Sequence, residues 1–451
     1  MNLPHSSGCT TASASRDASL ARPSPYRWVI LIACWLSFTL TSIDRSTWGP
    51  ASVFVGDGLG VPIASLGVFA TAYYIGYVIS NALGGLGVDR YGPRIVLTTS
   101  LTGAGVFMTV FGSTPSATVG IAVQAVVGLF AGADYSAGVR LISSWFPSHR
   151  LGLPMGIFTT ATSLGTAIAN AVVPALIAWH GWGTSYHVFG VLSIVVAVPL
   201  FLLVRNQPDA MTARPVSGGA EKDTDPVTGA VRSGSRGRLD FGGIARNRDY
   251  VLVCVTGFCG FWGLYGFITW ANALMIRGHD MSPGTAGLVV SVFAITAVVA
   301  KPVIGYVTDR FCGGARKIPT IAILGVFALA LMWFGQLSTP TAFILLSPLL
   351  GAAAYGWTPL IVALVPRLVP SSVTGTASGI ANAIWQLGSV LVPLAVGAVF
   401  SATDSFDAAF VTLAIGPVLA ILVIAPVRAG GARRTRDDHP RSGAEKTSPV
   451  A

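Results

Sequence analysis

Residues 85–94 read Gly85-Leu-Gly-Val-Asp89-Arg90-Tyr-Gly92-Pro-Arg94 and lie between two long apolar runs. They hold one acid, two arginines and three glycines in a chain of which only 10% is charged. A reduced copy, Gly305-Tyr-Val-Thr-Asp309-Arg310, follows later, with Arg316 and Lys317 after it. Its first glycine comes 220 positions after Gly85, close to half of the 451 residues. The spacing predicts two related halves, each with a charged turn at the same membrane face.

The apolar runs beside these turns are long enough to cross a bilayer. Hydrophobic residues make up 52% of the chain, whereas a soluble domain is usually about one quarter charged. A spanning helix needs roughly 20 mainly apolar residues, and the short alternating segments of a membrane β-barrel are missing. We therefore expect an all-α membrane protein of twelve spans: Trp28–Trp48, Ile63–Val88, Ile95–Gly112, Ala117–Trp145, Leu151–Trp179, Tyr186–Val204, Tyr250–Ile276, Pro283–Thr308, Ile318–Gln336, Ala342–Val365, Gly375–Phe400 and Phe406–Val427.

The formal net charge of +10 indicates how the chain is oriented in the membrane and does not indicate a nucleic-acid partner. With the N-terminus in the cytoplasm, 24 of the 28 lysines and arginines fall in cytoplasmic segments. Three lie inside spans, and only Arg277 falls in an external loop. This is the positive-inside rule. It predicts a multi-pass protein of the cell membrane with both termini cytoplasmic.

Composition divides the chain into five parts. Residues 1–25 and 429–451 are expected to be disordered cytoplasmic ends. Residues 205–248 are rich in Gly, Ser, Asp and Arg and poor in aliphatics, which predicts a disordered cytoplasmic linker. It separates two six-helix bundles at residues 26–204 and 249–428. The five cysteines form no cluster with metal-ligand spacing, so we expect no disulfide, metal or cofactor.

Two polar stripes extend the internal repeat. Thr159, Ser163 and Thr166 in span five correspond, at an offset of 223, to Asn382, Gln386 and Ser389 in span eleven. Each set runs i, i+4, i+7 and so forms a single stripe on a helix. Lipid cannot satisfy such groups, so they face either another helix or a water-filled cavity. For the hydroxyl stripe both alternatives stay open, and for the two amides we favour the cavity.

Twelve spans, a linker at mid-chain and Gly-x-x-x-Asp-Arg-x-Gly-x-Arg between spans two and three together resemble the major facilitator superfamily. The resemblance covers about residues 26–428. It implies two six-helix bundles around a central cavity that opens alternately to each side. It also implies that Gly85, Asp89, Arg90, Gly92, Arg94, Asp309 and Arg310 form a gating motif. We expect this motif to act as a charged latch that steadies the outward-open state, although topology marking alone is the alternative.

Within the superfamily the chain looks most similar to the anion:cation symporters. The likeness lies in Ile43-Asp44-Arg45, in Trp145-Phe146-Pro147, and in Gly263-Leu-Tyr265…Thr269-Trp270 with the loop after it. Members of that group often place an arginine and a glutamate early in span four. This chain has Gln124 and Ala131 at those places, and Asp134, about one turn further on, is the candidate to replace the acid.

Asp44 and Arg45 are the sharpest candidates for chemistry. A charge inside a span costs at least about 2.5–3.5 kcal/mol at mid-depth, so it persists when it pairs or functions. Arg45 offers a planar fork for a carboxylate, sulfonate or phosphate. Asp44 and Asp134 are the candidate proton carriers. The alternative for Asp44 and Arg45 is a structural ion pair. For Lys301 in span eight, three roles remain possible: an ion pair, a gate contact or a substrate contact.

Span seven places Trp262, Tyr265, Thr269 and Asn272 on one face. Aromatic residues at helical spacing usually pack, but this stripe ends in polar groups, which favours a cavity lining. The predicted substrate-binding residues are Arg45, Tyr77, Gln124, Trp262, Tyr265, Asn272, Asn382 and Gln386.

The leading hypothesis is a monomeric secondary transporter that takes up a small organic anion, a carboxylate or sulfonate, with protons. Proton-driven export of a drug-like or secreted metabolite is the alternative within the same fold, and sodium stays open as the coupling ion. A non-transporting membrane sensor would need a folded extra domain, and neither the linker nor the tail offers one. The chain has no phosphate loop, metal constellation or nucleophile with a positioned base, so we expect no enzyme.

Overall fold

The structure is a computed structural model and describes residues 25–146, 152–206, 246–311, 316–369 and 374–428. The N-terminal half comprises α1 (Tyr26–Ser46), α2 (Trp48–Leu59), the 3-10 turn η1 (Ile63–Ser65), α3 (Gly67–Tyr91), α4 (Pro93–Gly112), α5 (Ala117–Trp145), α6 (Gly152–His180) and α7 (Trp182–Leu203). The C-terminal half comprises α9 (Arg248–Gly278), α10 (Pro283–Phe311), α11 (Lys317–Gly335), α12 (Pro340–Gly356), α13 (Thr358–Val362), α14 (Val365–Leu368), α15 (Thr374–Thr403) and α16 (Phe406–Ile424). Most of the linker and both ends of the chain lie outside the described residues.

Twelve helical segments of the described chain are long and apolar enough to span a membrane, which confirms the expected all-α class. The first span is longer than its apolar pattern predicted, because it runs on from Tyr26 to Leu59. Thr47 interrupts it without leaving helical geometry, and its backbone N–H still bonds the Ile43 carbonyl at 2.8 Å. The helix ends at Gly60, whose φ of 66° is the left-handed conformation that favours glycine.

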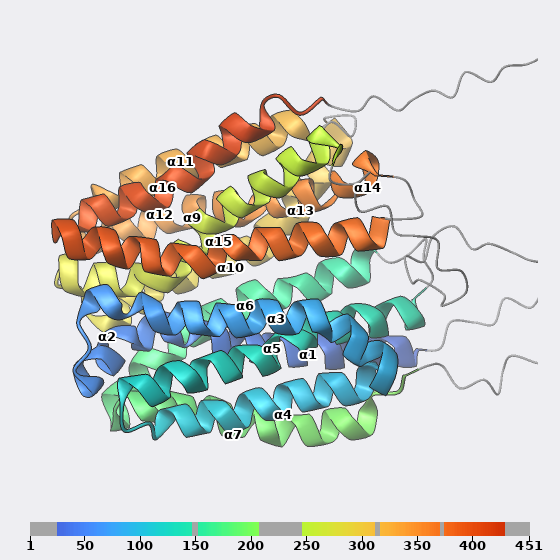
Figure 1. Ribbon diagram of the computed structural model, residues 1–451. Coiled ribbons are helices and arrows are strands. Elements are labelled where there is room, and N and C mark those ends of the chain that lie inside the picture. Colours follow the sequence, from blue (N-terminus) through green and yellow to red (C-terminus); the bar gives the residue numbers. More distant parts are fainter. Residues whose placement is uncertain (1–24, 147–151, 207–245, 312–315, 370–373, 429–451) are drawn as a thin grey trace, which may run out of the picture.

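The two halves lie side by side as separate helical layers, blue to green and yellow to red in Figure 1. Their largest contacts are between two equivalent pairs of helices, α3 against α15 and α6 against α10, and α2 also packs against α9. The two equivalent pairs are spans two and eleven and spans five and eight, so the internal repeat of the sequence is also a repeat in space.

The two ends of the molecule differ. At the linker end, the Tyr26 hydroxyl bonds the Leu203 carbonyl, and the Arg428 amide bonds Asp249. The starts of α1 and α9 therefore lie at the same end as the ends of α7 and α16 (Figure 1). We call the opposite end, which holds Leu59 and Gly278, the far end.

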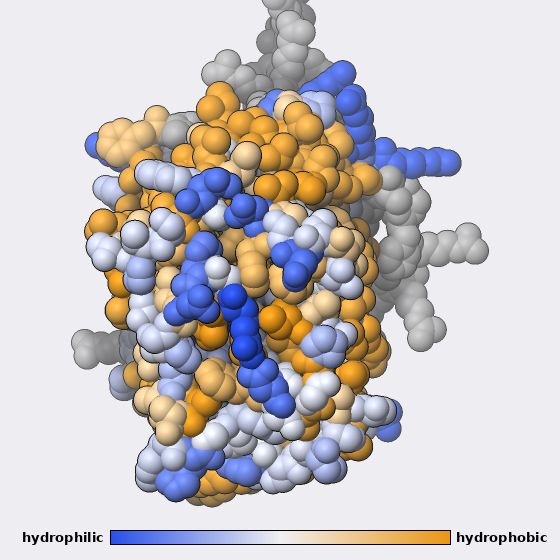
Figure 2. Space-filling view, turned by 90° about the vertical axis from the view of Figure 1, so that its left-hand side faces the viewer, coloured by the Kyte–Doolittle hydropathy of each residue, from blue (hydrophilic) through white to orange (hydrophobic). Residues whose placement is uncertain are grey.

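The halves are pressed together at the far end. A Cβ on Gly67 of α3 would lie 2.1 Å from the Pro393 carbonyl oxygen of α15, and one on Gly287 of α10 would lie 2.2 Å from that of Asn170 in α6. Such approaches leave no space for a side chain. Figure 2 looks onto this end, where hydrophilic side chains gather across the middle of the surface.

The same four helices are apart at the linker end. Gly85 of α3, Gly156 of α6, Gly305 of α10 and Gly379 of α15 have no heavy atom within 4 Å of where a Cβ would stand. The molecule is therefore closed at the far end, and its paired helices separate toward the linker end.

Candidate substrate site

Arg45 is buried on α1 between the two halves. Its side chain is 8% exposed, and its guanidinium lies over the rings of Tyr77 in α3 and Tyr265 in α9, at 5.9 and 5.4 Å. No ion pair among the described residues includes it, and its Nε has no hydrogen-bond partner. A buried charge without a partner is costly, so the arrangement is suited to an anion that arrives between the halves.

Tyrosines from both halves surround this guanidinium. Tyr73 and Tyr77 stack on α3 with ring centroids 6.1 Å apart, and Tyr74 meets Tyr265 across the halves at 5.5 Å. The Tyr73 hydroxyl is buried without a hydrogen-bond partner. Aromatic faces hold the carbon skeleton of a ligand, while hydroxyls orient its polar groups.

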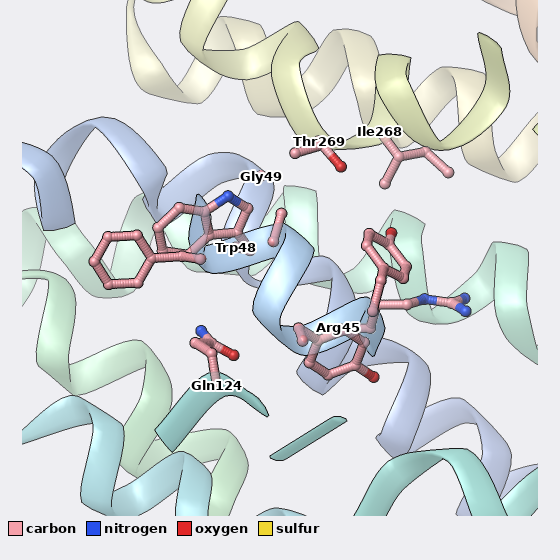
Figure 3. Close-up of a pocket in the computed structure, with 10 residues that line it drawn as sticks. Arg45, Trp48, Gly49, Gln124, Ile268 and Thr269 are labelled. Atoms are coloured by element: carbon pink, nitrogen blue, oxygen red, sulfur yellow. The ribbon is translucent and has the colours of Figure 1, made fainter. Parts of the chain in front are cut away.

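A small cavity lies on the far-end side of Arg45 (Figure 3). Trp48, Gly49, Gln124 and Thr269 are among its lining residues. Its volume is about 10 Å³, roughly the space that one water molecule needs. In Figure 3 the Arg45 guanidinium points away from Trp48 and Gln124. Gln124 therefore shares a cavity with Arg45, although the two polar groups are not directed at one another.

Asp44 does not pair with Arg45, which rules out the structural ion pair in this conformation. Consecutive residues on a helix point about 100° apart, and the Asp44 carboxylate faces the Ser193 side chain of α7 instead. Neither carboxylate oxygen makes a hydrogen bond, although both are buried. Asp44 is thus an acid held in the N-terminal half with its polar atoms unsatisfied.

Asp134 is a second buried acid, and its oxygens are satisfied by α1. Ser37 donates to Oδ1 at 2.7 Å and Thr41 donates to Oδ2 at 3.0 Å. Thr41 lies one turn and Ser37 two turns before Arg45 on the same helix. The charge state of Asp134 therefore bears directly on the helix that carries Arg45. Arg140, also on α5, is exposed and takes no part in this cluster.

Lys301 of α10 reaches across to α6. Its ammonium donates to Ser163 Oγ at 2.8 Å, to Thr162 Oγ1 at 3.1 Å and to the Thr159 carbonyl at 3.4 Å. It also lies 4.5 Å from the ring centroid of Tyr355. Part of the hydroxyl stripe of span five thus binds a cation from the other half. This conformation shows Lys301 in a hydrogen-bonded contact between the halves, and its role as a gate or substrate contact stays a prediction.

The remaining predicted binding residues occupy three different places. Asn272 donates to Asn170 Oδ1 across the halves at 2.8 Å, and its own Oδ1 is unpartnered. Trp262 packs inside the C-terminal half, where its indole N–H bonds the Thr412 carbonyl at 2.9 Å. On α15, buried Gln386 accepts a bond from Ser389 at 3.2 Å, and Asn382 is half-buried one turn away.

The charged turn is organised within its own half. Gly92 has a φ of 83° and ends α3. The Arg94 Nε donates to the Phe201 carbonyl at 2.7 Å and its backbone N–H to Asn206 at 2.9 Å, which ties the turn to the end of α7. Asp89, Arg90 and Arg310 are exposed, and the Asp309 side chain lies outside the described residues. The latch stays a prediction, because this end of the molecule is open here.

Some residues near Arg45, Asp44 and Asp134 were not predicted from the sequence. Three of them had a recognisable pattern in the sequence, and one had none. Tyr74 carried a signal, since it sits beside Tyr73 and Tyr77 on α3. Ser37 and Thr41 also did, being one turn apart on the span that holds Arg45. Ser193 carried none, because nothing in its own span marks it as facing Asp44. Among the described residues no three His, Cys, Asp or Glu side chains gather where they could hold a metal ion.

Comparison with known proteins agrees with this architecture. A family model described as Major Facilitator Superfamily matches residues 34–282 and again residues 253–450. Among solved structures, a bacterial homolog of the human lysosomal transporter Spinster, inward-facing and unoccupied, has a TM-score of 0.68 at 16% identity, with 89% of this chain and 95% of that one covered. A D-xylose-proton symporter has a TM-score of 0.66 at 18% identity, with coverage of 89% and 98%.

Curated relatives are named for organic anions. The probable galactarate/D-glucarate transporter GudP of Bacillus subtilis is 24% identical over 432 residues, which cover 88% of this chain and 90% of that protein. The probable sulfoacetate transporter SauU of Cupriavidus necator is 25% identical, with 89% and 94% covered. The D-galactonate transporter of Escherichia coli O6:H1 is also 25% identical, with 84% and 90% covered. With its twelve spanning helices and two matched halves, the chain belongs to the Major Facilitator Superfamily and is a membrane transporter, not an enzyme.

Proposed function

We propose that this transporter takes up a small organic anion together with protons by alternating access. The observation that carries the proposal is Arg45, a guanidinium buried between the halves with tyrosine rings around it and no acidic partner among the described residues. The names of the relatives, which include acid sugars and sulfoacetate, support the same substrate class. The positive-inside rule makes the linker end cytoplasmic, so the present conformation is inward-facing.

Arg45 binds the acidic group of the substrate through its planar fork. Tyr77 and Tyr265 pack on the substrate backbone, and because they come from different halves, a bound substrate draws the halves together. The partnerless Tyr73 hydroxyl and the free Asn272 oxygen offer hydrogen bonds to hydroxyl groups of the substrate. Substrate binding thereby favours the closed states through which the protein passes between its two open forms.

Asp44 and Asp134 carry the coupling protons in this proposal. Asp134 receives hydrogen bonds from Ser37 and Thr41 of α1, and Asp44 lies on α1 itself. A proton taken up by either acid removes a negative charge near the Arg45 helix, which lowers the repulsion that an arriving anion meets. Release of proton and substrate at the linker end restores the original charge state.

Equilibrium binding of D-galactonate, galactarate and sulfoacetate to the purified protein tests the proposal. The wild type should bind at least one of them, and Arg45→Gln should lose that binding while it keeps its melting temperature. Arg140→Gln is the matched control, because it removes an exposed arginine outside the site. Undiminished binding in Arg45→Gln would overturn the anion site, and tighter binding of uncharged compounds would favour the drug-export alternative.

A further inference from the structure

Lys301 is a cation without an acidic partner in the part of the chain that the structure describes. Its three oxygen partners on α6 are two hydroxyls and a backbone carbonyl, all neutral. No ion pair among the described residues includes it. An anionic acceptor adds the attraction between two full charges to the hydrogen bond, whereas a hydroxyl or carbonyl offers only its dipole. An arriving anionic group would therefore compete well with the present partners of Lys301.

Lys301 and Arg45 belong to the same space. The Lys301 ammonium lies 4.5 Å from the ring centroid of Tyr355 in α12, and its partner Ser163 precedes Thr166 by one turn on α6. Thr166 Oγ1 in turn lies 2.9 Å from the hydroxyl of Ser46, the residue after Arg45 on α1. One cation comes from α1 of the N-terminal half and the other from α10 of the C-terminal half, and each has tyrosine rings beside it.

We propose that Lys301 is a second anion-binding residue, so that the site takes an anion with an acidic group at each of its two ends. Arg45 binds one group and Lys301, once it has left α6, binds the other. The proposal rests on the proposed function, since it specifies the substrate class of the same site. A singly charged anion satisfies only one of the two cations, whereas a dianion satisfies both and connects the two halves.

The present contacts of Lys301 are compatible with this role. A lysine ammonium is a compact charge on a flexible stem, and Lys301 is only half-buried. Its hydrogen bonds to Thr162 and Ser163 hold it against α6. Transfer of the ammonium to a dianion would break these bonds between α6 and α10. Binding of the second acidic group would thereby loosen one contact between the halves.

Galactarate and D-galactonate are matched probes, because they share a six-carbon hydroxylated skeleton and differ in having two acidic groups or one. Their binding is measured by calorimetry on the purified full chain in lipid nanodiscs, for wild type, Lys301→Gln and Lys301→Arg. Lys317→Gln is the control, since Lys317 starts α11 at the linker end, away from the site.

We expect wild type to prefer galactarate, and Lys301→Gln to weaken galactarate binding roughly ten- to hundredfold, the loss of one charge-assisted hydrogen bond. D-Galactonate binding should change less than about twofold, and Lys301→Arg should keep the preference. Ser163→Ala removes the shortest tie to α6 and should tighten galactarate binding, which provides a second test if Lys301→Gln fails to fold.

Equal loss of both anions in Lys301→Gln, no preference in wild type, or unchanged galactarate binding in Ser163→Ala would each overturn the dianion proposal. In these cases Lys301 is a contact between α10 and α6 only. Failure of the proposed function is distinguishable: wild type then binds neither probe, or Arg45→Gln binds both as well as wild type does.

Discussion

Replacement of Gly287 by alanine should move the transporter out of the far-end-closed conformation. The added Cβ would lie 2.2 Å from the Asn170 carbonyl oxygen and 2.9 Å from the Pro174 ring, both on α6 of the other half. Overpacking of this kind costs about 1–3 kcal/mol. The strain acts between the halves rather than within one, so it is relieved when the far end opens. A shift of this size changes the ratio of the two conformations about 5- to 150-fold.

The assay is maleimide labelling of a cysteine at Thr71 in purified protein whose five native cysteines are replaced by alanine. Thr71 is 6% exposed, and its hydroxyl bonds the Val390 carbonyl across the halves at 2.9 Å. Gly284→Ala is the matched control on the same helix, because a Cβ there meets nothing within 4 Å. Gly287→Ala should label faster than Gly284→Ala. Equal labelling in two folded variants would refute the account of how the far end closes.

The other predictions concern charge and coupling. Arg45→Lys should weaken anion binding at least about tenfold without loss of membrane insertion, because a point charge replaces a bidentate fork; binding assays and expression decide this. Asp134→Asn should abolish proton-driven accumulation yet keep counterflow exchange, and concentrative uptake in this variant would exclude Asp134 as the coupling acid. Asp57→Asn breaks an exposed ion pair with Arg277 between α2 and α9; such pairs contribute about 0–1 kcal/mol, so far-end labelling should rise only a few-fold and less at high salt. Gln386→Ala should alter substrate affinity more than melting temperature, and the reverse pattern would place Gln386 in helix packing.

The sequence predicted the architecture because its signals are additive over many residues. Each span is a run of about 20 apolar residues, and a few misplaced boundaries do not alter the number of crossings. The repeat was visible in pairs such as Gly85 with Gly305 and Gly156 with Gly379, whose spacing is that of the two halves. In space the same glycines lie on the paired helices and are separated at the linker end.

The site was less predictable, because it depends on how helices are rotated against their neighbours. Asp44 and Arg45 adjoin in sequence yet face α7 and the space between the halves, respectively. Trp262 shares a stripe with Tyr265, but it packs against α16. The partners of Lys301 are about 140 positions away in the other half, and no local pattern links them. Which end is closed is likewise a property of the packed molecule rather than of any span.

Uptake into proteoliposomes under an imposed pH gradient shows whether this transporter couples accumulation of an organic anion to protons. Wild type, Arg45→Gln and empty vesicles are compared with labelled galactarate, with the outside more acidic than the lumen or at equal pH. We expect wild type to accumulate the anion above its external concentration only with the gradient, and Arg45→Gln not to accumulate it. Equal accumulation with and without the gradient, or accumulation in Arg45→Gln, would contradict proton-coupled uptake at the Arg45 site.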